Sequence, residues 1–253
     1  PVILLFFLDV FLWLSNAGKS ILIKFDLDIM ASEFRTRLRL ENGPFAFSLS
    51  APDAHIGQFY YAERFAEELL VKREKSPKVK IVRLCQEDVL KHDYLLDRLR
   101  AEFQCTIRDW FRDNPELDLM IFARNDDSSG IEADEMSDIA SDCWEIVMER
   151  HADLLEEQDQ CFVVFWCNVG VPPVQIEAER FFLLNSPDRF HLEQIKKYWS
   201  SQLKKKAGLD EFTTYLHVKT LLECQGDVKA TYSQMCVILN ELNQGSGGVH
   251  AHY

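Results

Sequence analysis

The stretch CFVVFWCNVG, residues 161–170, decides the fold class. Apolar side chains fill both of its alternating sets of positions, a pattern typical of a strand that is covered on both faces in a parallel sheet. We therefore expect a central strand with helices on both sides. The two faces are expected to carry Phe162, Val164 and Trp166 on one side and Val163, Phe165 and Cys167 on the other.

Four other apolar runs have the length and composition of strands. They are PFAFSLS (44–50), VKIVRLC (79–85), LDLMIFA (117–123, which would also suit a helical turn) and RFFLLN (180–185). Apolar residues at helical spacing separate them, at 59–69, along one long helix at 96–110, and at 136–146. Strands that alternate with helices predict an α/β fold with a mainly parallel sheet of about five strands, flanked by helices.

After Asn185 the strands stop, and three amphipathic helices are expected. Their predicted buried faces are Leu192, Ile195, Trp199 and Leu203 in the first, Leu209, Phe212 and Leu216 at the start of the second, and Val228, Tyr232, Met235, Leu239 and Leu242 in the third. We interpret these helices as a lid subdomain that packs on the sheet.

The first fourteen residues, PVILLFFLDVFLWL, are apolar but interrupted by Asp9. A membrane-spanning helix needs about 20 apolar residues, so this run is short for an anchor. A signal peptide suits its length, although no basic residue precedes it. We favour a third interpretation, in which translation begins at Met30 and residues 1–29 are dispensable.

Four parts of the chain follow from these patterns. We expect an N-terminal apolar or leader segment at 1–40 that need not belong to the fold, a degenerate P-loop-like α/β domain at 41–186, a C-terminal helical subdomain at 187–243, and a disordered tail at 244–253.

The net charge and the cysteine content limit the binding partners and the cellular compartment that we expect for this chain. A net charge of −13 repels phosphate backbones, so nucleic acid is not an expected partner. The seven cysteines include no C-x-x-C pair, which favours a reducing compartment and indicates no zinc site. We therefore expect a cytoplasmic protein, with a membrane role only if residues 1–14 are native.

The loop in LSAPDAHIGQFYY (49–61) lies between a strand and a helix, where a phosphate-binding loop would lie. A working loop reads G-x-x-x-x-G-K-[ST], with lysine on the phosphates and a hydroxyl on Mg²⁺. In that frame only Gly57 matches, while Gln58 replaces the lysine and Phe59 the hydroxyl. We interpret this loop as a vestigial phosphate loop that binds neither cofactor nor metal. Its marker residues are Pro52, His55, Gly57, Gln58 and Phe59.

A second partial match, NAGKS at 16–20, is interpreted as coincidence because a β-branched run rather than a helix follows it. An active NTPase also needs an acidic residue at a strand end to organise Mg²⁺ and water. Asp126 and Asp127 are the best metal-ligand candidates, but we expect both in a solvated loop.

The motifs of three other enzyme classes are incomplete or absent in this sequence. Asp53 lacks the E-x-K that a nuclease of the PD-(D/E)xK type requires. Glu67 and Glu68 suit the helix-borne glutamate of a TIR-like hydrolase, yet we expect them on a solvated face. No G-x-S-x-G elbow is present, and His55 is the one histidine placed where an active site would lie.

The order of elements resembles the inactive STAND family, whose nucleotide-binding motifs are eroded. The residues that carry the resemblance are the Gly57-Gln58 loop, the FVVFWCNVG strand and the helical tail, over roughly residues 44–242. The resemblance implies a P-loop NTPase-like domain that serves as a scaffold in bacterial regulatory or conflict systems. It also implies coupling to small adaptor domains, a remnant of which would precede Glu41.

The residues predict a pseudoenzyme without catalytic residues, and the resemblance implies a non-catalytic scaffold that binds adaptor or effector proteins in signalling or defence. No small-molecule substrate is expected. The alternative is a divergent STAND-type switch that still binds ATP or GTP.

Overall fold

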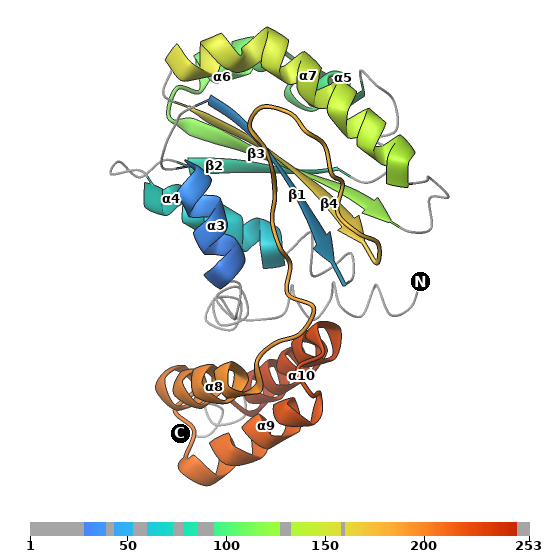
Figure 1. Ribbon diagram of the computed structural model, residues 1–253. Coiled ribbons are helices and arrows are strands. Elements are labelled where there is room, and N and C mark those ends of the chain that lie inside the picture. Colours follow the sequence, from blue (N-terminus) through green and yellow to red (C-terminus); the bar gives the residue numbers. More distant parts are fainter. Residues whose placement is uncertain are drawn as a thin grey trace. The chain divides into compact units, whose positions relative to one another are not determined.

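The computed structural model describes residues 28–38, 43–52, 60–72, 78–84, 94–126, 133–157 and 160–246 (Figure 1). The chain divides into an α/β unit, Met30–Ser186, and a helical unit from Pro187 onward. The division after Ser186 coincides with the predicted domain boundary at that point.

A five-stranded sheet forms the centre of the α/β unit, in the order β2-β3-β4-β1-β5, with every neighbouring pair parallel. The strands are β1 (Gly43–Ala51), β2 (Lys78–Leu84), β3 (Leu117–Asp126), β4 (Cys161–Val169) and β5 (Phe181–Leu183). β4 lies between β3 and β1, as expected for the strand with two apolar faces. The predicted α/β fold with a parallel sheet and flanking helices is confirmed.

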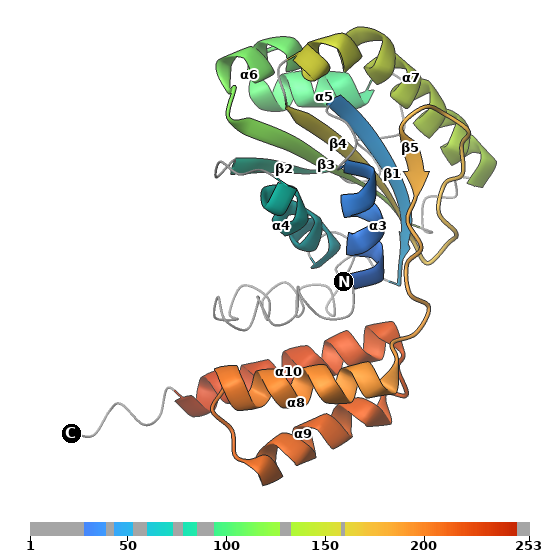
Figure 2. The same cartoon turned by 60° about the vertical axis from the view of Figure 1, so that its left-hand side comes forward.

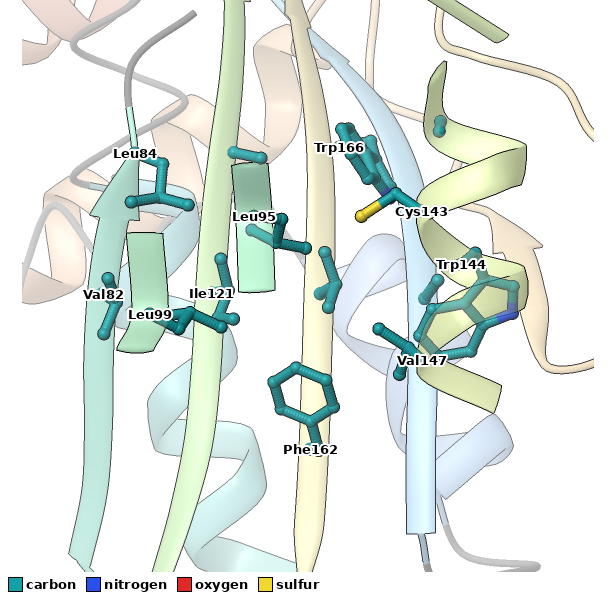
Figure 3. Packing of buried hydrophobic residues seen from close by; sticks show 14 of the residues in the cluster. Val82, Leu84, Leu95, Leu99, Ile121, Cys143, Trp144, Val147, Phe162 and Trp166 are labelled. Atoms are coloured by element: carbon teal, nitrogen blue, oxygen red, sulfur yellow. The ribbon is translucent and has the colours of Figure 1, made fainter. Parts of the chain in front are cut away.

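Helices cover both faces of the sheet (Figure 2). One face carries α3 (Asp28–Leu38) and α4 (Ala62–Lys72), and the other carries α5 (Tyr94–Phe103), α6 (Ile107–Asp113) and α7 (Ala133–Glu157). Phe162 and Trp166 of β4 point into a cluster with Leu95, Leu99 and Trp144 on the second face (Figure 3).

The first face holds a cluster of phenylalanine rings. Phe165 of β4 stacks on Phe65 of α4 with centroids 4.6 Å apart, and its ring lies 5.1 Å from Phe122 and 5.5 Å from Phe34. Alternate residues of β4 therefore pack on opposite faces, which confirms the predicted central strand.

Helix α3 corrects the predicted start of the domain at residue 41. Met30, Phe34 and Leu38 are buried, and the Phe34 ring lies 4.9 Å from the rings of both Phe47 and Phe65. Because these side chains belong to the core, the fold begins before the predicted boundary at residue 41. Residues 1–27 lie outside the described residues.

Two further expectations were wrong in detail. The predicted helix at 96–110 is two helices, because Gln104 has a φ of 56° and the Thr106 hydroxyl caps α6 by accepting a hydrogen bond from Asp109 N at 3.1 Å. β3 also extends through Asp126, which was expected in a loop, because its polar end pairs with β4 in register Asn125↔Asn168 and Asp126↔Val169.

The helical unit contains α8 (Leu192–Lys206), α9 (Glu211–Glu223) and α10 (Val228–Ser246). α8 and α10 bury Ile195, Trp199, Tyr232 and Met235 of the predicted faces, whereas Leu192, predicted for the first of these faces, is 44% exposed. α10 continues past the predicted end of the subdomain at 243, and residues 247–253 of the predicted tail lie outside the described residues. Among the described helices, none has the length and apolar character needed to cross a membrane.

Candidate functional site

β1 and β4 meet at the switch point of the sheet. The chain leaves β1 toward α4 on one face, whereas the chain leaving β4 passes over the other face, where Val174 packs in the same cluster as Trp144. In open parallel sheets ligands bind outside the carboxyl ends of the strands at such a point. This edge is therefore the candidate site.

The predicted vestigial phosphate loop emerges at this edge. β1 ends at Ala51 and α4 begins at Ala62, so the loop has the strand–loop–helix setting that the sequence predicted. Pro52 is exposed. His55, Gly57, Gln58 and Phe59 lie outside the described residues, and their role stays a prediction.

Two buried asparagines, Asn125 of β3 and Asn168 of β4, occupy the same edge. Asn125 Nδ2 donates to Asn168 Oδ1 at 3.5 Å, and Asn168 Nδ2 donates to the carbonyl of Pro172 at 2.5 Å. Ser50 of β1 donates its hydroxyl to the carbonyl of Val171 at 3.0 Å. These polar groups hold the segment after β4 against the strand ends, so they are engaged in local structure.

The polar strand ends at this edge include two neutral amides and one carboxylate, that of Asp126. Mg²⁺ in proteins is bound by oxygen ligands that usually include one or two carboxylates, and β4 ends in Asn168 and Val169. Asp126 lies at the end of β3, while Asp127 falls outside the described residues. Among the residues that the structure describes, no group of three or more His, Cys, Asp or Glu side chains is placed to hold a metal ion.

Glu68, expected on a solvated face, is buried. Its carboxylate lies 2.9 Å from Arg64 Nη2 in the same helix and 3.2 Å from Arg35 Nε in α3, with the Glu68 side chain 6% exposed. The expectation failed because α3 covers this side of α4. Two guanidinium groups neutralise the carboxylate, so it joins the two helices and is not presented to a substrate.

Two half-buried thiols have raised pKa values and are therefore not activated as nucleophiles. Burial is the largest cause at both Cys105 and Cys224. The carboxylates of Asp109 and Asp113 add to it at Cys105, and those of Asp227 and Glu223 at Cys224. Thiolate chemistry at neutral pH is disfavoured at both positions.

Helix α9 exposes Phe212 and Leu216, two residues of its predicted buried face. Phe212 is 70% exposed, Tyr215 61% and Leu216 45%, whereas Thr214, Val218 and Leu221 form the buried side of this helix. The prediction failed because α9 carries apolar residues on two sides. The apolar spacing that starts at Phe212 follows the exposed side of the helix and not the buried side.

No protein family model matches the chain, and no curated protein matches it. Among solved structures, Rif2 in complex with the C-terminal domain of Rap1 is similar over 94% of this chain and 90% of that chain, with 12% identity and a TM-score of 0.45. Saccharomyces cerevisiae RIF2 alone matches over 90% and 87%, with 10% identity and a TM-score of 0.46. The ADP form of Aeropyrum pernix ORC2 matches over 87% and 64%, with 12% identity and a TM-score of 0.45. At these values the likenesses assign the chain to no family.

Proposed function

We propose that this chain is a non-catalytic scaffold that binds another protein through the exposed face of α9. In keeping with the resemblance to inactive STAND proteins, we place it in a cytoplasmic signalling or defence system of bacteria. The exposed α9 face is the observation that carries this proposal.

The α9 face, defined here as Phe212, Tyr215 and Leu216, is a contiguous apolar surface. Residues three and four apart lie next to each other on a helix, so the three side chains adjoin. The backbone of Phe212 is held by the N-cap of α9, where Asp210 Oδ1 accepts hydrogen bonds from Phe212 N at 2.9 Å and Thr213 N at 3.0 Å. The face is therefore built on a rigid element.

The composition of the α9 face suits protein recognition. Large aromatic side chains are enriched at the centres of protein interfaces and contribute much of their binding energy. Full burial of one such side chain is worth about 1.5–3 kcal/mol relative to leaving it in water. A partner that covers the face with an apolar stripe of its own gains this energy without any rearrangement of α9.

The absence of catalysis is supported by residue chemistry. Gln58 and Phe59 replace the lysine and the hydroxyl of a working phosphate loop. At the same edge the described ends of β3 and β4 carry Asn125 and Asn168, and Asn168 accepts a hydrogen bond from Asn125 and donates one to the Pro172 carbonyl. Neutral amides can orient a ligand but do not act as general bases at neutral pH.

The test compares partner binding by three forms of the chain. Proteins that cross-link to the wild type in cells are quantified against those that cross-link to the double variant Phe212→Ser/Tyr215→Ser. Val237→Ser is the control, because Val237 is also exposed, at 42%, but lies on α10. A partner is then purified and titrated directly.

The expected result is a partner that binds the wild type and Val237→Ser equally and loses affinity for the α9 variant by at least about tenfold. Equal binding by all three purified forms would overturn the α9 assignment.

The alternative, a divergent switch that binds ATP or GTP, is favoured by one observation. The predicted phosphate loop emerges at the switch point between β1 and β4, where nucleotides bind in folds of this class. Titration with nucleotide distinguishes the two functions and is described in the Discussion.

A further inference from the structure

A cavity of about 450 Å³ opens between α5, α6 and α7, away from the candidate site. α6 leads into the start of β3 and the end of α7 leads toward the start of β4, so the cavity lies toward the amino edge of the sheet. Its polar lining comprises Asp97, Arg100, Thr106, Arg108, Arg150 and His151.

The lining is basic, although the whole chain carries a net charge of −13. Three arginines and one aspartate contribute to it, which gives a net lining charge of two positive units when His151 is neutral. Arg100 is paired with Asp97 at 3.3 Å. Arg108 and Arg150 form no ion pair with any residue that the structure describes, so their charge is available to a ligand.

His151 adds an unsatisfied polar atom to the cavity. Its Nδ1 is buried and forms no hydrogen bond within the described part of the chain. Burial, with the nearby positive charges of Arg108 and Arg150, lowers the pKa of this imidazole. The ring is therefore neutral at pH 7 and can offer a hydrogen bond to a ligand without adding charge.

We propose that this cavity binds a phosphate monoester. A monoester carries nearly two negative charges at pH 7, which matches the net charge of the lining. Guanidinium groups donate two parallel hydrogen bonds to phosphate oxygens, and the three arginines come from three separate helices that surround the cavity. The cavity volume lies in the range typical of small-molecule sites and leaves room for the organic part of the ester.

Calorimetric titration of the full chain tests the proposal. The probes are glycerol phosphate and AMP, with glycerol and adenosine as uncharged counterparts and malonate as a dicarboxylate of equal charge. A phosphoserine peptide and its unmodified form distinguish a modified protein from a free metabolite as the source of the ester. The variants are Arg108→Gln/Arg150→Gln and, as control, Arg112→Gln. Arg112 is exposed on α6 but pairs with Asp109 at 2.9 Å and does not line the cavity.

The expected result is binding of at least one ester by the wild type, weakened about tenfold for each charge-assisted hydrogen bond lost in the double variant and unchanged in Arg112→Gln. The uncharged probes should not bind. Three results would overturn the proposal: equal affinity for malonate, no ester binding by the wild type, or ester binding that the double variant retains. In particular, AMP bound at the carboxyl edge of the sheet would be insensitive to the double variant, so the two sites are distinguished.

Discussion

The substitution Glu68→Gln tests whether the buried ion pairs join α3 to the rest of the fold. It removes the charge of Glu68 but preserves its size. Arg64, with a side chain 9% exposed, then keeps its positive charge but loses the Glu68 counter-charge, while Arg35, at 36%, remains accessible to water. Arg64 therefore accounts for most of the expected loss.

The size of the effect follows from the burial of Arg64. Removal of one partner of a buried ion pair costs about 3–5 kcal/mol, and the amide oxygen of glutamine still accepts a hydrogen bond, so we expect the lower end, about 3 kcal/mol. In a protein of this size that corresponds to a fall of about 6–12 °C in the melting temperature.

Two matched variants make this prediction decisive in thermal and urea unfolding. Glu63→Gln breaks the Glu63–Arg83 pair of the same helix, whose side chains are 39% and 28% exposed, and should cost at most about 1 kcal/mol. Arg64→Met/Glu68→Met removes both charges and should recover most of the stability, because the buried guanidinium that loses the Glu68 carboxylate in Glu68→Gln is then absent. If Glu68→Gln were no more destabilising than Glu63→Gln, the burial argument would be refuted.

Four other predictions follow from the fold and the site. Val164→Asp buries an unpaired charge in the central strand at a cost of several kcal/mol, so no soluble folded protein is expected, and a folded variant would show that β4 is an edge strand. Gly226→Ala should lower the free energy of unfolding by more than about 1 kcal/mol. Gly226 has a φ of 79°, and an added Cβ would collide with the Phe190 carbonyl oxygen. An unchanged urea midpoint would contradict this prediction. Calorimetric titration with ATP or GTP and Mg²⁺ should show no binding at the carboxyl edge, since a helix N-terminus alone supplies only about 0.3–1 kcal/mol against the roughly 8 kcal/mol of a micromolar site. Micromolar binding that is lost when Gly57 is replaced by a bulky residue would favour the switch. Removal of residues 1–27 should leave the melting temperature unchanged. Removal of residues 1–34 should lower it sharply, because the buried Phe34 ring is then lost. Equal melting temperatures of the two truncated chains would show that α3 is not part of the core.

The strands could be predicted because the pattern of apolar side chains along each strand reflects which of its faces are buried. β4 is apolar at both alternating positions, and those positions meet helices on both faces. What the sequence could not supply was the order of the strands. Residues distant along the chain, such as Ala46 and Val164, become partners in the sheet only through the way the chain crosses its two faces.

Helix α3 and the polar end of β3 were missed for opposite reasons. Met30, Phe34 and Leu38 recur at helical spacing, so the signal for α3 was present, but the polar residues between them suggested an ordinary chain start. Asn125 gave no strand signal at all. Its polar side chain is buried in a strand because Asn168 of the neighbouring strand accepts its hydrogen bond.

The elements on either side of the predicted phosphate loop could be foreseen, but the role of the loop stays a prediction. A strand before it and a helix after it were expected, and β1 ends at Ala51 and α4 begins at Ala62. The buried position of Glu68 depends on Arg35, which the sequence analysis had left outside the domain. The α9 face could not be separated from the core because burial of an apolar helix is decided by its neighbours, which the sequence of that helix does not specify.

The central place of β4 has a consequence for synthesis on the ribosome. Among the strands that the structure describes, β1 is made first and pairs with β4 and β5, so it gains its first partner when residues 161–169 have left the exit tunnel. Until then both edges of β1 are open and Phe47 lacks the Phe165 ring of β4 that stacks on it at 5.5 Å, while β2 and β3 can already pair. Unpaired edges and uncovered apolar residues make a nascent chain prone to association. Newly made molecules of this protein should therefore depend on chaperones that hold the chain for most of its translation, and a stalled chain that ends before residue 161 should be aggregation-prone whereas one that extends beyond residue 186 should not.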